Sequence, residues 1–257
     1  MKLLLANDDG VHAPGIRILY QELKTKFPTT IIAPLEERST TGHSLSLDKP
    51  LRLEKLEPNI YGCSGFPGDC VLMGLHVLKD ERPDVVISGI NRGANLGQDL
   101  YYSGTVAAAR EAAFHKVPSI AVSLVINSVV EEHLYHTAAQ VIRLCLEHGM
   151  HENIPALTLI NINVPNLELS KIKGYKLTEI GFRRYSEEIH ARVDVRQRDY
   201  FWIAGLYEGF AENPASDCQA IHDGYVSITP HALVDKTTKE YSGLVNVIAR
   251  LNATIAS

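Results

Sequence analysis

Short apolar runs recur along the first 165 residues, and stretches that read as helices separate them. The runs lie at residues 2–7, 30–33, 83–90, 119–125 and 157–164. Short, mainly apolar runs are typical of strands that are buried on both faces of a parallel sheet. Helices are predicted between them, over residues 14–26, 70–78, 106–115 and 130–148. Strands that alternate with helices predict an α/β fold, in which helices flank a mainly parallel sheet.

The pattern changes after residue 165. Residues 173–178 alternate between apolar and polar side chains, residues 181–200 are rich in charge, and residues 200–204 form an aromatic strand. We predict long β-hairpins that project from the core as an arm. An arm with little core of its own is expected to pack on a partner subunit, and the alternative is a solvated, flexible hairpin.

The remaining C-terminal residues are expected to complete the same structural unit. Residues 217–229 return to strand character, and a final helix is predicted over residues 238–251. We therefore expect a core at residues 1–165, followed at residues 166–257 by an arm, returning strands and a terminal helix that serve oligomerisation.

Composition and charge exclude several classes of protein. The chain has 257 residues with a formal net charge of −5, which predicts no surface for nucleic-acid polymers or membranes. Its four cysteines are scattered and do not indicate a disulfide scaffold. Neither a signal peptide nor an apolar run long enough to span a bilayer is recognisable, so a cytoplasmic location is expected.

The first apolar run ends in two adjacent carboxylates, Asp8 and Asp9, followed by Gly10. Ligands of open α/β sheets bind at the carboxyl ends of the strands, where these side chains are expected. Neighbouring carboxylates repel each other unless a cation compensates them, and hard divalent cations prefer oxygen ligands. The alternative is that Asp-Asp-Gly only forms a turn.

Two further loops leave strand ends at the same predicted edge. One carries Ser39 and the other carries Asn91. Together with the Asp pair they supply four oxygen ligands, which suit Mg²⁺, Mn²⁺ or Ca²⁺ better than Zn²⁺. Ser39 and Asn91 could instead serve only their own turns.

A helix that opens at Ser103, Gly104 and Thr105 offers free backbone N–H groups to an anion such as phosphate. Ser103 and Thr105 could equally be plain helix caps. Asn95 is a candidate donor to the same phosphate oxygens. His43 is a candidate general acid for the leaving alcohol, or else a partly exposed loop histidine.

Several short motifs occur in an order and spacing that together are specific to one protein family. They are Asn7-Asp8-Asp9-Gly10, Pro14-Gly15-Ile16, Ala33-Pro34, Ser39, Gly42-His43-Ser44, Ser88-Gly89-Ile90-Asn91-Arg92-Gly93, Ser103-Gly104-Thr105-Val106-Ala107-Ala108-Ala109 and Gly224-Tyr225-Val226-Ser227-Ile228-Thr229-Pro230. In these motifs the chain resembles the SurE family, the stationary-phase survival proteins, from residue 2 to about residue 231.

The resemblance implies a Rossmann-like core, and an arm and C-terminal helix that are exchanged in a homodimer or homotetramer. It also implies a phosphatase that hydrolyses nucleoside 5'-monophosphates to nucleoside and phosphate with metal-activated water, with 3'-monophosphates as a second substrate class. Such a 5'-nucleotidase would hold one divalent cation per subunit on Asp8, Asp9, Ser39 and Asn91. Mg²⁺ and Mn²⁺ are the first candidates, and Ca²⁺ and Co²⁺ are the alternatives.

Two other functions stay open at this point. The first is a phosphatase that passes through a phospho-aspartate, with Asp8 or Asp9 as the nucleophile. The adjacent positions of the two carboxylates lack the Asp-x-Asp spacing of haloacid-dehalogenase-like enzymes. The second is a non-catalytic sensor that binds a nucleotide or a metal ion without turnover.

Overall fold

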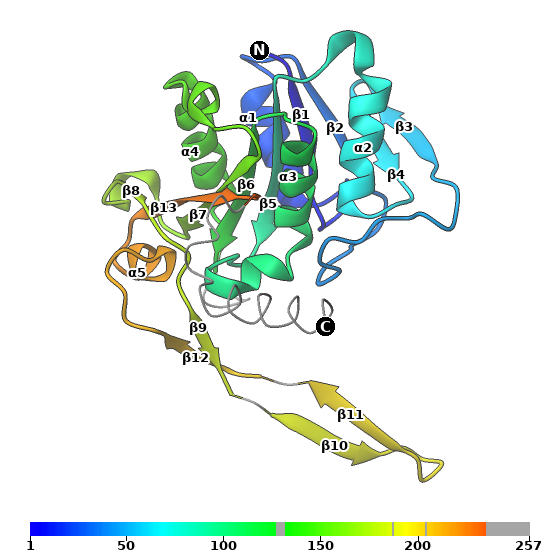
Figure 1. The fold of residues 1–257 in the computed structure, drawn as a ribbon, viewed down its shortest axis with the longest axis vertical. Coiled ribbons are helices and arrows are strands. Elements are labelled where there is room, and N and C mark those ends of the chain that lie inside the picture. Colours follow the sequence, from blue (N-terminus) through cyan, green and yellow to red (C-terminus); the bar gives the residue numbers. More distant parts are fainter. Residues whose placement is uncertain (127–131, 187, 204, 235–257) are drawn as a thin grey trace, which may run out of the picture.

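In the computed structural model, a nine-stranded sheet forms the centre of the molecule (Figure 1). The structure describes residues 1–126, 132–186, 188–203 and 205–234. The sheet order is β3-β4-β2-β1-β5-β6-β7-β13-β8. The bounds of these strands are β1 Leu3–Ala6, β2 Thr29–Pro34, β3 Leu53–Glu57, β4 Ile60–Cys63, β5 Val85–Arg92, β6 Ser119–Val125, β7 Thr158–Pro165, β8 Tyr175–Leu177 and β13 Val226–Ala232.

The six central strands, from β4 to β7, run parallel to one another. Antiparallel neighbours flank them, because β3 pairs antiparallel with β4 and β13 pairs antiparallel with β7. The α/β fold predicted from the alternating pattern is therefore confirmed. Since parallel strands point the same way, β1, β2 and β5 bring their carboxyl ends to one edge of the sheet.

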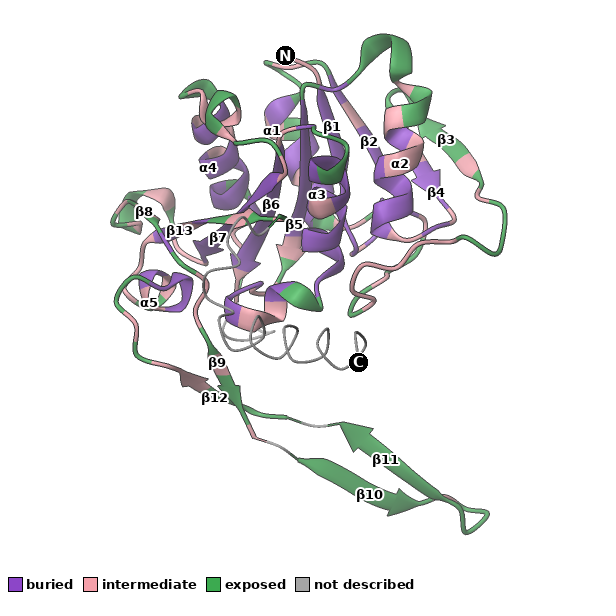
Figure 2. Ribbon diagram, viewed as in Figure 1, coloured by how far each residue is buried: buried purple, intermediate pink, exposed green. Residues whose placement is uncertain are grey.

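Helices cover both faces of the sheet and bury the apolar strands (Figure 2). One face carries α1 (Pro14–Leu23) and α4 (Tyr135–Glu147), and the other carries α2 (Pro67–Val77) and α3 (Gly104–Phe114). Side chains alternate across β1, so that Leu5 packs with α1 and α4 while Leu4 packs with α2 and α3.

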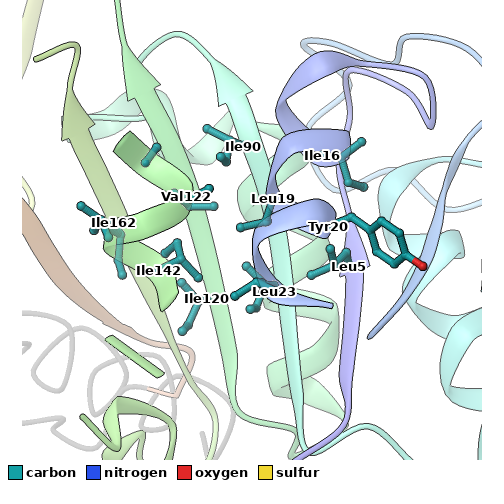
Figure 3. Packing of buried hydrophobic residues seen from close by; sticks show 14 of the residues in the cluster. Leu5, Ile16, Leu19, Tyr20, Leu23, Ile90, Ile120, Val122, Ile142 and Ile162 are labelled. Atoms are coloured by element: carbon teal, nitrogen blue, oxygen red, sulfur yellow. The ribbon is translucent and has the colours of Figure 1, made fainter. Parts of the chain in front are cut away.

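The packing against α1 explains why its sequence forms a helix there. Ile16, Leu19 and Leu23 recur at helical spacing and lie against Leu5 and the strands beside it (Figure 3). Pro14 occupies the first turn, where its missing N–H group costs nothing. Burying each of these side chains contributes about 1.5–3 kcal/mol, which holds the helix on the sheet.

One part of the expected strand at residues 217–229 is wrong. Residues Asp217–His222 form the short helix α5, and the strand begins only at Val226. Ser216 caps α5, because its hydroxyl accepts a hydrogen bond from the Gln219 N–H group. Gly224, with a φ of 84°, then turns the chain into β13.

The predicted arm is present and projects from the α/β body (Figure 1). Its strands are β9 Arg183–Tyr185, β10 Ile189–Val193, β11 Asp199–Ile203 and β12 Tyr207–Phe210. The pair β9–β12 forms the root of the arm, and β10–β11 forms its distal hairpin, whose strand residues are all exposed. The helix expected over residues 238–251 lies outside the described residues.

Short 3₁₀ turns complete the described structure. They are η1 Lys79–Glu81, η2 Gly97–Tyr101, η3 Met150–Asn153 and η4 Leu169–Lys171. Within the described ranges, no helix has the length and apolar character that crossing a membrane requires.

Candidate active site

A polar cavity of about 310 Å³ lies at the carboxyl edge of β1, β2 and β5. Its wall contains all four predicted metal ligands and two of the predicted phosphate-binding residues. The lining residues are Asp8, Asp9, Glu37, Ser39, Thr40, Asn91, Arg92, Asn95, Asp99, Tyr102 and Ser103. Residues up to 95 positions apart in sequence thus meet where parallel strands end, as the order of the loops predicts.

Asp8 is fixed by the first turn of α3. Its side chain is only 4% exposed, and the Thr105 hydroxyl donates a hydrogen bond to Asp8 Oδ1. Burial raises the pKa of Asp8, while the Thr105 hydroxyl and the N–H groups of Gly104 and Thr105 act in the opposite direction. Thr105 and Gly104, predicted as phosphate-binding residues, are therefore in contact with this carboxylate and do not belong to the cavity lining.

Gly104 allows α3 to approach Asp8 this closely. A Cβ atom at position 104 would lie 2.7 Å from Asp8 Cβ and 2.9 Å from Asp8 Oδ2. Separations this short between non-bonded atoms are not tolerated, so any other residue would displace either the helix or the carboxylate.

Asp9 lies beside Asp8 and is less deeply buried. Burial and, second, the neighbouring charge of Asp8 raise the pKa of Asp9 to about 6. The backbone N–H group of Arg92 donates a hydrogen bond to Asp9 Oδ2 at 3.2 Å, which acts in the opposite direction. Two carboxylates that destabilise each other's charge form a site that a cation would relieve.

Ser39 and Asn91 add neutral oxygen atoms to the cavity wall. Ser39 lies on an exposed loop and donates its hydroxyl proton to Glu37 Oε1 at 2.7 Å. The lone pairs of its hydroxyl oxygen can therefore coordinate a cation. Asn91 Nδ2 donates to the Gly93 carbonyl at 2.9 Å, so its amide is oriented by its nitrogen and keeps Oδ1 as an acceptor. Both oxygen types are ligands of hard cations.

The charge of the cavity wall also favours a cation. Four carboxylates line it, those of Asp8, Asp9, Glu37 and Asp99, whereas Arg92 is its single basic residue within the described ranges. An anionic phosphate would be repelled from such a wall unless a bound cation compensated the carboxylates. In the part of the chain that the structure describes, no three His, Cys, Asp or Glu side chains gather into a metal-binding group. The Asp pair would therefore depend on the oxygens of Ser39 and Asn91.

Asn95 and Ser103 occupy the wall beside the N-terminus of α3. Asn95 is 6% exposed, and its Nδ2 atom donates to Ser123 Oγ at 2.8 Å. Its backbone N–H group donates to Asn163 Oδ1 at 2.9 Å, so that polar side chains of β6 and β7 hold this loop. Ser103 is the N-cap of α3, because its hydroxyl oxygen accepts from the Val106 N–H group at 3.1 Å. Among the described residues, the Ser103 hydroxyl proton has no acceptor.

His43 is not among the described side chains that line the cavity. Its Nε2 atom lies 2.8 Å from Glu111 Oε2, and its ring stacks on Phe114 with centroids 5.9 Å apart. The side chain therefore ties the loop of Ser39 to α3, on the side of the helix that carries Glu111. The position of His43 in its loop did not indicate that the side chain would point towards Glu111.

Several lining residues were not predicted as site residues. They are Glu37, Thr40, Arg92, Asp99 and Tyr102. Glu37, Thr40 and Arg92 lie within two residues of predicted ligands, which is a signal that sequence reasoning could have used. Asp99 forms an ion pair with Arg183 at 2.6 Å, and the separation of these residues along the chain hides the pair from local patterns.

Comparison with known proteins identifies the family. The profile described as "Survival protein SurE" matches residues 3–187. A protein of Thermosipho africanus named "5'-nucleotidase SurE" is 45% identical over 245 residues, which is 94% of each chain. Its namesake from Geobacter sulfurreducens is 43% identical over 232 residues, covering 90% of this chain and 87% of its own. The crystal structure of the SurE protein from Aquifex aeolicus superposes with a TM-score of 0.85 and 36% identity, over 97% of this chain and 100% of that one. The chain belongs to the SurE family.

Proposed function

We propose that this protein is a divalent-metal-dependent phosphatase that hydrolyses nucleoside 5'-monophosphates to nucleoside and phosphate, with 3'-monophosphates as a second substrate class. The observation that carries the proposal is the acidic oxygen cage of Asp8, Asp9, Ser39 and Asn91 beside the N-terminus of α3. The name "5'-nucleotidase SurE" of its relatives supports the same activity.

The cage is proposed to hold one divalent cation per subunit, with Mg²⁺ or Mn²⁺ ahead of Ca²⁺ and Co²⁺. Two carboxylates, a hydroxyl and an amide oxygen suit hard cations, which prefer oxygen ligands. When bound, such a cation offsets phosphate charge and lowers the pKa of a coordinated water. Asp8 would act as a preformed ligand, since the Thr105 hydroxyl already orients it.

The wall next to the cage is proposed to bind the phosphate. Ser103 has a hydroxyl proton to donate, and the N-terminal end of α3 carries a partial positive charge. Asn95 is held by Ser123 and Asn163, so its position is fixed before substrate arrives. Donors fixed in this way hold the phosphoryl group in line for attack without reorganising.

The arm is proposed to assemble subunits into a homodimer or homotetramer. Cross-strand pairs place Ile189 beside Ile203 and Ala191 beside Phe201 on one face of the distal hairpin. Ile203 is 91% exposed and Phe201 is 65% exposed. A two-stranded hairpin with an exposed apolar face is only marginally stable in water, so a second subunit is expected to cover that face.

The cytoplasmic location expected from the sequence stays a prediction.

The experiment is phosphate release from a panel of nucleoside monophosphates, measured before and after removal of divalent cations with EDTA. We expect release that EDTA abolishes and that Mg²⁺ or Mn²⁺ restores. Release that is unaffected by EDTA would refute the metal-dependent reaction. Trapping of a phosphorylated Asp8 or Asp9 would favour a covalent intermediate, and binding without release under any metal would favour a sensor.

A further inference from the structure

A second cavity, of about 370 Å³, lies between the loop that follows β5, the root of the arm and α5. Figure 1 shows that β9 and β12 leave the body beside α5. Most of its lining residues are aliphatic or aromatic, and Arg183, Cys218 and His222 add polar atoms to the wall. Cavities of a few hundred Å³ that combine apolar and aromatic side chains with polar groups are typical of small-molecule sites.

This cavity shares two wall elements with the active-site cavity. Ala94 and Leu96 line it, whereas Asn95 between them lines the active-site cavity. Arg183 lines it and forms an ion pair with Asp99 of the active-site wall, with Arg183 Nη1 2.6 Å from Asp99 Oδ2. One short loop and one ion pair therefore separate the two cavities.

The arm root is held firmly against this loop. Gln98 Nε2 donates to the Arg183 carbonyl at 2.7 Å, and the Arg183 N–H group donates to Gln98 Oε1 at 2.8 Å. Asp217 of α5 accepts from the N–H groups of both Gly97 and Gly181, each at 2.9 Å. Because loop, arm root and α5 are bonded to one another, the second cavity has a fixed position relative to the phosphate-binding wall.

The lining groups have the chemistry that binds a planar heteroaromatic ring. Tyr207 and Phe210 supply aromatic side chains, and the Arg183 guanidinium lies 4.2 Å from the centroid of the Tyr207 ring. The Nε atom of Arg183 is buried and has no hydrogen-bond partner among the described residues. Stacking surfaces together with an unused donor suit a nucleobase, which offers a π-face and ring acceptors.

We propose that this second cavity binds the base of the nucleoside monophosphate whose phosphate occupies the active-site cavity. The proposal rests on the phosphatase function, because it assigns the other end of the same substrate. The substrate would span the loop of Ala94 and Leu96, with its ribose beside the Asp99–Arg183 pair. A sugar phosphate without a base would use the active-site cavity alone.

The test compares AMP with ribose 5-phosphate, which carries the same phosphoester without the base. Tyr207 is 50% exposed, so Tyr207→Ala is not expected to disturb folding. We expect the ratio of kcat/KM for AMP to that for ribose 5-phosphate to fall about tenfold in this variant, the loss typical of one stacking aromatic. Tyr200→Ala, on the distal hairpin, is the matched control and should keep the wild-type ratio.

Calorimetric binding of adenosine to the wild type and to Tyr207→Ala separates this proposal from the phosphatase function. If neither substrate is hydrolysed, the phosphatase proposal fails, while weaker adenosine binding by the variant would still support the base site. An unchanged substrate ratio together with unchanged adenosine binding would overturn the base site. A wild-type protein that does not bind adenosine at millimolar concentration would overturn it as well.

Discussion

Replacing Asp9 with Asn should separate catalysis from stability. The substitution keeps the shape of the side chain and keeps an oxygen that accepts from the Arg92 N–H group, but it removes one of two adjacent negative charges. Loss of a charged ligand should lower metal-dependent phosphatase activity by at least about 100-fold, since changes even to groups behind the ligands cost 10–100-fold. The metal-free protein should become more stable.

The magnitude of the stabilisation follows from the pKa of Asp9. Burial and the charge of Asp8 raise this pKa from 3.8 to about 6. A rise of about two units corresponds to about 3 kcal/mol at neutral pH, and partial exposure of the side chain reduces this to about 1–2 kcal/mol. For a chain of this size, about 2–4 °C per kcal/mol gives a rise in Tm of about 2–8 °C.

The contribution of Asp9 to the free energy of unfolding should change with pH in one direction. Because the folded-state pKa of Asp9 lies above the unfolded value, its contribution to stability is complete below about pH 4 and is lost as pH rises through about 6. The stabilisation by Asp9→Asn in metal-free protein should therefore be small at pH 4 and full at pH 7.

The assay is thermal unfolding in EDTA from pH 4 to pH 7.5, together with AMP hydrolysis in Mn²⁺. Asp80→Asn, on an exposed turn far along the chain from the Asp pair, is the matched control and should change neither property appreciably. A lower Tm for Asp9→Asn in EDTA at pH 7 would refute the argument that the two carboxylates repel each other. Retention of near wild-type activity would refute the role of Asp9 as a ligand.

Three further substitutions test other parts of the account. Gly104→Ala should lower activity at least tenfold, because its Cβ atom would lie 2.7 Å from Asp8 Cβ and 2.9 Å from Asp8 Oδ2. Gly68→Ala is the control, because its Cβ atom would meet only side chains, those of Leu45 at 3.0 Å and His43 at 3.6 Å; equal activity in both variants would contradict the close-approach argument. Thr105→Val should lower the unfolding free energy by about 1–3 kcal/mol in denaturant titrations, because a buried carboxylate loses its donor, and an unchanged midpoint would count against that bond. Phe201→Ser should shift sedimentation towards smaller species, whereas Arg192→Ser on the opposite face of the hairpin should not; the same assembly in both would exclude the apolar face as the contact.

The sequence predicted the sheet and the position of the cavity because both follow from local pattern. The uninterrupted apolar run at Leu3–Ala6 predicts a buried strand, and the Asp pair follows it closely. The two carboxylates were therefore expected at the carboxyl end of that strand. Ser39 follows β2 and Asn91 lies at the carboxyl end of β5, and parallel pairing brings all three strand ends to one edge. No distance was needed to expect these four residues around one cavity.

Side-chain direction and long-range pairs could not be predicted in the same way. Whether His43 turns towards the Asp pair or towards Glu111 depends on how its loop packs against α3. The contact of Asp99 with Arg183 depends on where the arm leaves the body. Helix α5 is too short for its apolar spacing to be distinguished from that of a strand, and only the capping serine at position 216 indicated its start.

The most direct test of the central claim is the anomalous difference map of crystals grown with Mn²⁺ and a non-hydrolysable nucleoside 5'-monophosphate analogue. We expect one manganese peak per subunit, about 2.0–2.3 Å from oxygens of Asp8 and Asp9, with Ser39 and Asn91 completing the protein ligands. The phosphate should lie between this peak and Ser103. Manganese bound elsewhere, or phosphate density outside this cavity, would contradict the account.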